Sequence, residues 1–281
     1  MKEDGKVNVP TLVKWAGGKK QLLLQFKSLL PRKIERYIEP FLGGGAVAFH
    51  ILTNHSEVKE VILSDVNEEL INTYMQVKNN VEELIIKLKE HKEYHTKNGK
   101  DYYLKIRASK PIELTPLARA ARFIYLNKTC FNGIYRVNKN GDFNVPMGRY
   151  KNPMICDEKS LRKISLLLKK VKLKVGDFQQ IFQWTKKGDF IYLDPPYYPL
   201  NETSFTTYTK DDFLKKDHEK LKEVFEELNN RGCNVMLSNS DTKFIRELYS
   251  KYNPETVNAT RMINCDASKR GTIKEVVIKN Y

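Results

Sequence analysis

Cysteines, long apolar runs and a leader-like N-terminus are the features that this sequence has least of. Its 281 residues include only 4 cysteines, whose spacing fits neither a disulfide framework nor a zinc site. They are Cys130, Cys156, Cys233 and Cys265. No apolar run reaches the roughly 18 residues that a membrane span requires, and residues 1–10 are charged and polar, unlike a secretory leader. We therefore expect a soluble cytoplasmic protein that has reduced thiols and no metal site.

Acidic residues are also scarce relative to basic ones. The chain has 34 Asp and Glu against 49 Lys and Arg, which gives a formal net charge of +15 and a sequence pI of about 9.4. Lys and Arg that neutralise phosphates release condensed counterions, so nucleic acid is the first partner to consider. A lysine-rich solvated surface gives the same excess of charge, and the motifs must decide between the two.

Strand and helix patterns alternate at both ends of the chain, and no internal repeat interrupts them. Strands are predicted at residues 37–40, 58–63, 171–175, 190–193, 234–237 and 275–278, and helices at 46–52, 68–77 and 217–229. This alternation predicts an α/β fold with a doubly wound sheet, whose ligand sites lie at the carboxyl ends of its strands.

Residues 69–160 break this alternation. They contain lysine-rich helices, followed by the polar and aromatic stretch 127–150. We interpret the segment as a mainly helical insertion with a separate task. The predicted division is a catalytic domain of residues 1–68 and 161–281, with an inserted domain of residues 69–160.

The glycine turn Gly43-Gly44-Gly45 is the first candidate site. Three glycines after a strand permit positive φ and a close approach of the backbone to a ligand, which suits a nucleoside cofactor. The turn has neither the spacing of the dinucleotide fingerprint nor the lysine of a phosphate-binding loop. Asp65 ends the next predicted strand, where an acidic side chain commonly accepts hydrogen bonds from ribose hydroxyls. A turn needed only for packing is the alternative for the glycines alone.

The tetrapeptide Asp194-Pro195-Pro196-Tyr197 is the most specific element of the sequence. Its two prolines end the strand and present Asp194 rigidly at the tip. The Asp194 carboxylate and the Pro195 carbonyl are placed to accept hydrogen bonds from the two hydrogens of an aromatic amino group, such as that of adenine, and so favour the pyramidal nitrogen that develops during attack. Tyr197 would supply a stacking face for the base.

These residues resemble, in order, the motifs of the alpha group of Dam-type adenine methyltransferases, including GATC-specific members of restriction-modification systems. The matching segments are residues 13–19, 39–45, 65–67 and 194–197, and the resemblance covers nearly the whole chain. It implies an S-adenosylmethionine-dependent methyltransferase sheet with an inserted DNA-recognition domain. It also implies site-specific methylation of adenine in duplex DNA, which leaves S-adenosyl-L-homocysteine.

The resemblance also implies which residues contact the cofactor. The implied cofactor-binding residues are Trp15, Ala16, Gly17, Lys19, Glu39, Pro40, Phe41, Gly43, Gly45, Asp65, Val66, Asp177, Phe178 and Asp194. Of these, Asp177 and Phe178 would hold the adenine ring of the cofactor. The implied catalytic residues are Asp194, Pro195 and Tyr197.

Residues 131–136 and 143–150 are similar to the β-hairpin with which GATC-specific members enter the major groove. By this resemblance Arg136 donates two hydrogen bonds to one guanine and Lys14 reads the other. Ile134, where some members have leucine, and Pro146 would contact the thymine methyl. Phe131 stands where enteric members have the tyrosine that fills the gap left by the extruded adenine. Further implied DNA-binding residues are Asn132, Asn144 and Arg149. A small aromatic core would produce a similar alternation of aromatic and basic residues.

The adenine must leave the base stack before its amino group can meet the cofactor, at a cost of roughly a few kcal/mol. Phosphate contacts would help to offset that cost, and the candidates are Lys139, Arg149, Lys151, Lys269 and Arg270. The expected partner is double-stranded DNA, bound by a monomer without a membrane or an obligate protein partner. Any cognate endonuclease would act separately.

Some alternatives have less support. His91 and His95 are four residues apart on a predicted helix, but they lack the glutamate of a zinc-protease helix and a third ligand, so we expect a solvated helical face. A methyltransferase acting on RNA or on protein glutamine would use a related tetrapeptide. A non-catalytic DNA-binding relic of the fold is the second alternative.

Overall fold

A single sheet forms the centre of the computed structural model, which describes residues 9–200, 213–260 and 272–281. Within these residues the strand order is β3-β2-β1-β4-β5-β7-β6. The strands are β1 (Arg36–Glu39), β2 (Glu60–Asp65), β3 (Val171–Val175), β4 (Phe190–Leu193), β5 (Asn234–Ser240), β6 (Glu255–Thr260) and β7 (Thr272–Lys279). β1 to β5 run parallel, and β7 pairs antiparallel with both β5 and β6. The strand order reverses between β1 and β4, the point at which doubly wound sheets bind ligands.

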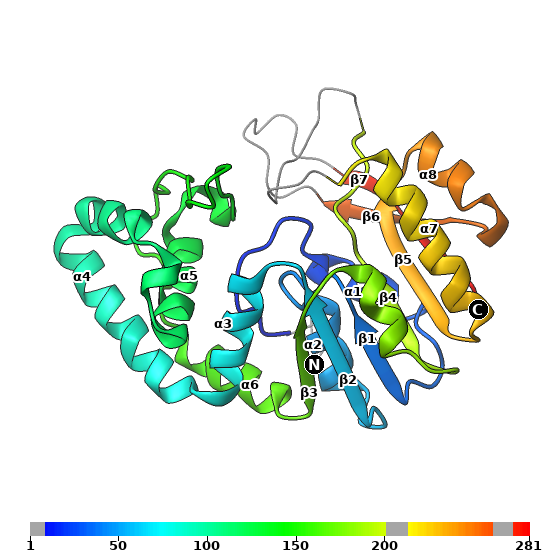
Figure 1. Cartoon of the computed structure of the whole chain (residues 1–281), viewed down its shortest axis with the longest axis horizontal. Coiled ribbons are helices and arrows are strands. Elements are labelled where there is room, and N and C mark those ends of the chain that lie inside the picture. Colours follow the sequence, from blue (N-terminus) through cyan, green and yellow to red (C-terminus); the bar gives the residue numbers. More distant parts are fainter. Residues whose placement is uncertain (1–8, 201–212, 261–271) are drawn as a thin grey trace, which may run out of the picture.

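Helices cover both faces of this sheet (Figure 1). The described α-helices are α1 (Leu23–Phe26), α2 (Ala46–Asn54), α3 (Glu68–Asn79), α4 (Val81–Ala108), α5 (Pro116–Thr129), α6 (Glu158–Leu168), α7 (Lys215–Asn230) and α8 (Lys243–Leu248). The described 3-10 helices are η1 (Lys19–Gln21), η2 (Pro111–Glu113), η3 (Phe131–Gly133), η4 (Phe178–Gln183) and η5 (Ser250–Tyr252).

Neighbouring residues of each strand enter different cores, because successive side chains point to opposite faces. Tyr37 belongs to the larger core, which includes α1, α2, α3 and α6. Ile38 belongs to the second core, under α7 and α8. Near-continuous apolar strands, such as β4 with all four residues buried, follow from burial on both faces.

α4 and α5 form a lobe beside α3, at the left of Figure 1. α5 packs against both α3 and α4, and the Tyr103 hydroxyl of α4 donates to the Val145 carbonyl at 3.0 Å. Thr115 caps α5 by accepting from the Ala118 N–H at 3.3 Å, and Pro116 occupies its first turn. The boundaries that we predicted for the inserted domain stay a prediction.

The prediction of a solvated face at His91 and His95 was wrong. The His91 ring stacks on Tyr125 with centroids 5.0 Å apart, and its Nδ1 lies 2.8 Å from the Tyr102 hydroxyl. His95 Nδ1 lies 2.9 Å from the Tyr125 hydroxyl. Helical spacing alone gave no sign of these two tyrosines, which come from later in the chain.

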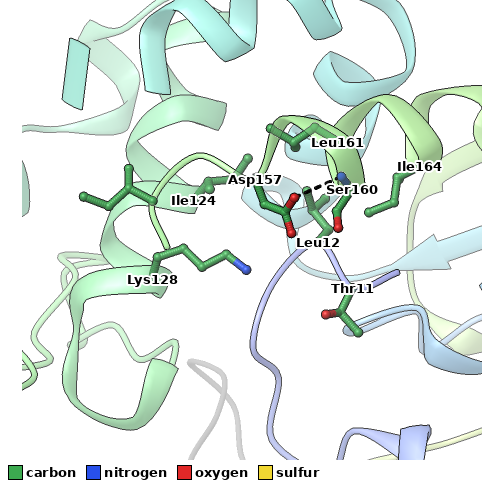
Figure 2. A pocket seen from close by; sticks show the side chains of 9 residues that line it. Thr11, Leu12, Ile124, Lys128, Asp157, Ser160, Leu161 and Ile164 are labelled. Atoms are coloured by element: carbon green, nitrogen blue, oxygen red, sulfur yellow. Dashed lines mark hydrogen bonds between the residues drawn. The ribbon is translucent and has the colours of Figure 1, made fainter. Parts of the chain in front are cut away.

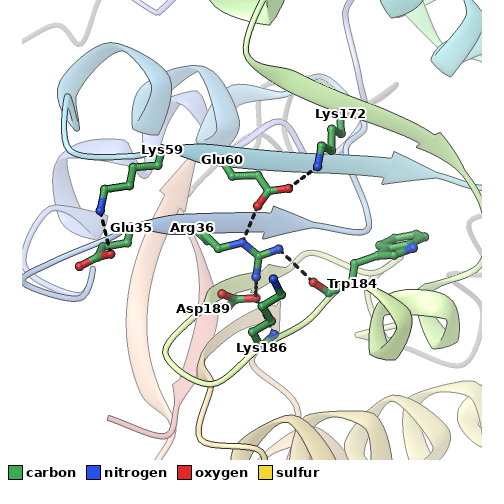
Figure 3. A network of polar contacts seen from close by, with 8 residues as sticks. All are labelled: Glu35, Arg36, Lys59, Glu60, Lys172, Trp184, Lys186 and Asp189. Atoms are coloured by element: carbon green, nitrogen blue, oxygen red, sulfur yellow. Dashed lines mark hydrogen bonds and ion pairs between the residues drawn. The ribbon is translucent and has the colours of Figure 1, made fainter.

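A polar network joins the amino ends of the central strands (Figure 3). Arg36 contacts Glu60 at 2.7 Å and Asp189 at 2.5 Å, and it donates to the Trp184 carbonyl at 3.1 Å. Glu60 also pairs with Lys172 of β3 at 2.6 Å. Because Asp189 is 2% exposed, Arg36 compensates a charge that water cannot reach.

A small pocket lies where the N-terminal segment meets α5 and α6 (Figure 2). Leu12, Ile124 and Leu161 supply apolar walls. Burial lowers the pKa of Lys128 there to about 8, and the charge of Lys14 acts in the same direction. This junction fixes the N-terminal segment against the helical lobe.

Two absences hold across residues 9–200, 213–260 and 272–281. No helix there is long and apolar enough to cross a bilayer, and no group of three or more His, Cys, Asp or Glu could hold a metal ion. Cys130, Cys156 and Cys233 are free thiols. Cys265 lies outside the described residues.

The predicted α/β class and doubly wound sheet are confirmed. Every predicted strand and helix is present, with ends that differ by a few residues. The sequence patterns did not indicate α1, α6, α8 or β6.

We expect Arg36→Met to lower the free energy of unfolding by about 3 kcal/mol, because Asp189 would lose its cationic partner while staying buried. Urea unfolding monitored by circular dichroism measures this change. The control is Lys59→Met, which removes an ion pair to Glu35 from a lysine side chain that is 77% exposed. That variant should change stability by less than about 1 kcal/mol. Equal effects of the two substitutions would contradict the prediction.

Candidate active site

Asp194 follows the last residue of β4 and points its carboxylate at the N-terminal segment. Its Oδ1 lies 2.9 Å from Lys19 Nζ, and the two side chains are 19% and 4% exposed. Oδ1 is buried, and the Lys19 ammonium is its partner. The carboxylate therefore has a charge partner and keeps a lone pair for a ligand.

Burial and charge act on Asp194 in opposite directions. Burial raises the pKa of its carboxyl to about 6, and Lys19 limits the rise. The negative charge of Glu275 adds a smaller upward effect. Asp194 is consequently ionised at neutral pH in a site from which water is largely removed.

The residues after Asp194 are fastened to the neighbouring strands. The Tyr197 hydroxyl donates to Glu275 Oε2 of β7 at 2.7 Å, and its ring centroid lies 4.6 Å from Lys19 Nζ. The Tyr198 N–H donates to Asn239 Oδ1 of β5 at 3.0 Å, and the Ser240 hydroxyl donates to the Tyr198 carbonyl at 2.6 Å. β5 and β7 thus hold the tetrapeptide from one side.

The glycine turn lies at the carboxyl end of β1 and is bonded to Asp65 at the end of β2. The Gly43 N–H donates to Asp65 Oδ2 at 3.0 Å, and the Asn67 N–H donates to Oδ1 at 3.0 Å. Burial raises the pKa of Asp65, and these backbone bonds oppose the rise. Each oxygen has two lone pairs, so the carboxylate retains the capacity to accept further hydrogen bonds.

Trp15 covers the glycine turn. Gly43 has φ +46, and a Cβ at this position would lie 2.6 Å from the Trp15 ring. The indole also stacks on Tyr135 and Phe123, with centroids 6.0 and 6.5 Å away. Trp15 therefore connects the turn with the helical lobe.

Two other predicted cofactor positions have structural partners. Glu39 is 2% exposed and accepts from the Tyr37 hydroxyl at 2.6 Å, and burial raises its pKa well above the usual value. Asp177 caps η4 by accepting from the Gln179 N–H at 2.9 Å. Phe178 stacks on Phe41 with centroids 5.5 Å apart, which gives the carboxyl ends of β1 and β3 an aromatic wall.

The 131–150 loop leaves α5 and returns as a short hairpin. Its backbone pairs through two isolated antiparallel bridges, Cys130 with Met147 and Val137 with Phe143. The predicted hairpin is thus confirmed, with isolated bridges in place of longer strands. Phe143 and Val145 are buried. Of the predicted DNA-binding positions on or beside the loop, Phe131, Arg136, Lys139, Asn144, Pro146, Arg149 and Lys151 are exposed, whereas Asn132 and Ile134 are half-buried.

Lys14 joins this loop from the N-terminal segment. Its Nζ lies 4.0 Å from the centroid of the Tyr150 ring, and the residue is exposed. Arg136 is held within the loop, where its Nε donates to Asn144 Oδ1 at 2.8 Å. Lys269 and Arg270 lie outside the described residues.

The predicted positions thus form two groups. The catalytic and cofactor positions meet at the carboxyl ends of β1, β2, β3 and β4, around Asp65 and Asp194. Val66 is at this edge too, with half of its surface exposed. The predicted DNA-binding positions gather at the loop of the helical lobe.

Comparison with known families shows to which family the chain belongs. Residues 15–263 match the model of the D12 class N6 adenine-specific DNA methyltransferases. The chain belongs to this family. The resemblance to Dam-type enzymes is thereby confirmed, and the chain is an adenine-specific DNA methyltransferase.

Curated relatives match this methyltransferase over nearly their full length. It is 46% identical to the Type II methyltransferase M.MjaIII of Methanocaldococcus jannaschii, over 98% of this chain and 100% of the relative. Its identity to the Type II methyltransferase M1.LlaDCHI of Lactococcus lactis subsp. cremoris is 41%, over 99% of this chain and 98% of the relative. The DNA adenine methylase of Haemophilus influenzae is 35% identical, over 94% of this chain and 91% of the relative.

Sequence reasoning missed several residues that shape the site of this methyltransferase. Glu275 was predicted only as part of a strand, yet it holds Tyr197. Asn239 and Tyr37 were given no role, although they hold Tyr198 and Glu39. No local signal marked these residues, because each acts through a partner that only the folded sheet brings near.

We expect Gly43→Ala to displace the Trp15 indole, since the new methyl group would overlap the ring. Fluorescence of Trp15 in a Trp184→Phe background measures the displacement as a shift in emission. The control is Gly188→Ala, where φ is +86 but no atom lies within 4 Å of the added carbon. Both substitutions should cost about 1 kcal/mol for the left-handed backbone. An unshifted emission in Gly43→Ala would show that the indole does not rest on the turn.

Proposed function

We propose that this methyltransferase transfers a methyl group from S-adenosylmethionine to the exocyclic amino group of an adenine in duplex DNA, within the sequence GATC. The observation that carries the proposal is Asp194 at the tip of β4, whose carboxylate lies 2.9 Å from Lys19 Nζ, is 19% exposed and has acceptor capacity left for a ligand. It lies at the reversal of strand order, where such sheets bind ligands.

The residues at this edge fit S-adenosylmethionine. Asp65 offers acceptor capacity for ribose hydroxyls, and Phe41 and Phe178 offer a flat apolar wall for the adenine ring. Trp15 and the turn at Gly43 would close the site from the N-terminal side. Once bound, the cofactor supplies a methyl group on a sulfonium centre with a good leaving group, so no covalent enzyme intermediate is needed.

Asp194 and the Pro195 carbonyl would act on the target adenine by accepting its two amino hydrogens. The lone pair of that nitrogen is delocalised into the ring, and these acceptors favour the pyramidal form in which it becomes nucleophilic. Tyr197 would stack on the base, and Glu275 fixes the direction of its ring through the hydroxyl. Lys19, which faces that ring, would have to yield the face to the base.

The target adenine would reach this site by rotating out of the duplex. The cost is roughly a few kcal/mol, and exposed Phe131 would fill the vacated space by stacking. Lys139, Arg149 and Lys151 are exposed on or beside the hairpin and suit phosphate contacts.

The GATC assignment rests on the exposed side chains of the hairpin. Arg136 would donate two hydrogen bonds to one guanine and Lys14 would read the other. Ile134 and Pro146 would contact the thymine methyl. Relatives named Type II methyltransferases support a restriction-modification role, in which a monomer works apart from any endonuclease.

We expect kcat/KM for S-adenosylmethionine to fall as the pH drops below about 6, because protonation of Asp194 removes an acceptor for the amino hydrogens. Lys19→Met should move this fall to higher pH, since Lys19 lowers the pKa of Asp194. Asp194→Ala should abolish methyl transfer at every pH while the chain stays folded. Steady-state methylation of a duplex with tritiated cofactor measures all three effects.

The control for this pH profile is Lys20→Met, which removes an exposed neighbouring lysine and should leave the fall where it is. Circular dichroism checks that each variant is folded. Full activity of Asp194→Ala would refute the mechanism, and so would a profile that Lys19→Met does not move.

We expect plasmid incubated with the protein and S-adenosylmethionine to resist a nuclease that adenine methylation blocks at GATC. The same plasmid should become sensitive to a nuclease that requires this methylation. Plasmid treated with Asp194→Ala is the matched control and should behave as unmethylated DNA. Protection confined to another sequence would contradict the assignment of GATC.

A further inference from the structure

Asn127, near the end of α5, binds the backbone of two segments, one around Lys14 that is far away in the sequence and one at Gly133 in the loop that follows α5. Its Oδ1 accepts from the Lys14 N–H at 2.8 Å, and its Nδ2 donates to the Lys14 carbonyl at 2.8 Å. Nδ2 also donates to the Gly133 carbonyl at 3.0 Å. The residue is 2% exposed, so these bonds form away from water. Both amide hydrogens and one acceptor site are thereby used on main-chain groups.

The two segments also touch each other directly. Gly133 has φ +66, and a Cβ there would lie 2.5 Å from Lys14 Cβ and Cδ. The Lys14 stem therefore passes over the bare glycine backbone, and its ammonium ends above the Tyr150 ring. Asn127 fixes the Lys14 main chain, Gly133 admits the stem and Tyr150 holds the charged end.

Each segment carries side chains that the proposed function assigns to reading bases. Lys14 lies on the N-terminal segment, whereas Ile134 and Arg136 follow Gly133 in the hairpin. Discrimination by hydrogen bonds to base edges requires donors at fixed separations, with a tolerance of about 0.5 Å. The only side chain among the described residues that bonds to both segments is that of Asn127.

We propose that Asn127 is a positioning residue for sequence recognition, which sets the distance between Lys14 and the hairpin residues Ile134 and Arg136. The inference rests on the proposed function, because it needs a DNA sequence to be read. Asn127 itself is buried and acts through these residues. Its loss should therefore affect the choice of sequence more than the binding of cofactor.

The variant that tests this is Asn127→Asp, which keeps the size and the acceptor but removes both donors. Asn280→Asp is a matched control. Asn280 Oδ1 accepts from the Val235 N–H at 2.7 Å, and its Nδ2 donates to the Cys233 carbonyl at 2.9 Å. This second asparagine makes the same kinds of bonds at the C-terminal end of the chain, away from the hairpin and the tetrapeptide.

A second pair of variants disturbs the same contact from the loop. Gly133→Ala would push the Lys14 stem away, whereas Gly141→Ala adds a methyl group in open space at φ +82 in the same hairpin. The pair keeps the inference testable if Asn127→Asp does not fold.

The measurement is kcat/KM of the full chain on the duplex site that the wild type prefers and on duplexes with one substituted base pair. The ratio of kcat/KM on the preferred site to kcat/KM on a substituted duplex measures sequence discrimination. We expect Asn127→Asp and Gly133→Ala to reduce this ratio by roughly tenfold or more. Asn280→Asp and Gly141→Ala should keep the wild-type ratio. Calorimetric titration with S-adenosylmethionine should give the same affinity for all five proteins.

A wild-type ratio in both Asn127→Asp and Gly133→Ala would overturn the inference and leave the proposed function intact. A loss of cofactor affinity parallel to the loss of ratio would overturn it as well, because it would indicate a general structural role. A wild type that methylates all duplexes equally would overturn both the proposed specificity and the inference.

Discussion

The ion pair between Asp194 and Lys19 is the interaction on which the site depends. Burial alone favours a protonated carboxyl, which would donate rather than accept a hydrogen bond. The ammonium 2.9 Å away keeps the charge on Asp194, and Oδ1 still has a lone pair to offer. The pair also ties the tip of β4 to the N-terminal segment. The charge on Asp194 and the local structure therefore come from one contact, so neither partner can be changed without affecting both.

The order of the strands explains why this contact is possible. β1 and β4 are parallel neighbours although they are far apart in the chain, so their carboxyl ends lie at the same edge of the sheet, and the chain continues from β1 to β2 on one side and from β4 to β5 on the other. The glycine turn and Asp65 lie on one side of this division, and the strands that hold Tyr197 and Tyr198 lie on the other. The antiparallel β7 brings Glu275 to the second side, where it can accept from the Tyr197 hydroxyl.

Elements with a strong local signal could be predicted from the sequence. The strand before Gly43 and the strand before Asp194 each contain apolar residues and are followed by glycines or prolines that end the strand. β6 could not, because the polar run Glu255–Thr260 becomes a strand only by pairing with β7 at the edge of the sheet. The stacking of His91 on Tyr125, the bond of Glu275 to Tyr197 and the bonds of Asn127 to Lys14 depend on partners from other elements, which no periodicity reveals.

The N-terminal segment joins the two groups of functional positions in a few residues. Lys14 faces the hairpin, Trp15 lies between the glycine turn and Tyr135, and Lys19 reaches Asp194. The side chains proposed to read DNA and those proposed to hold the cofactor therefore share one short stretch of backbone, residues 14–19. On the proposed function, a single segment of the chain thus places Lys14 at the DNA, Trp15 over the cofactor turn and Lys19 beside Asp194.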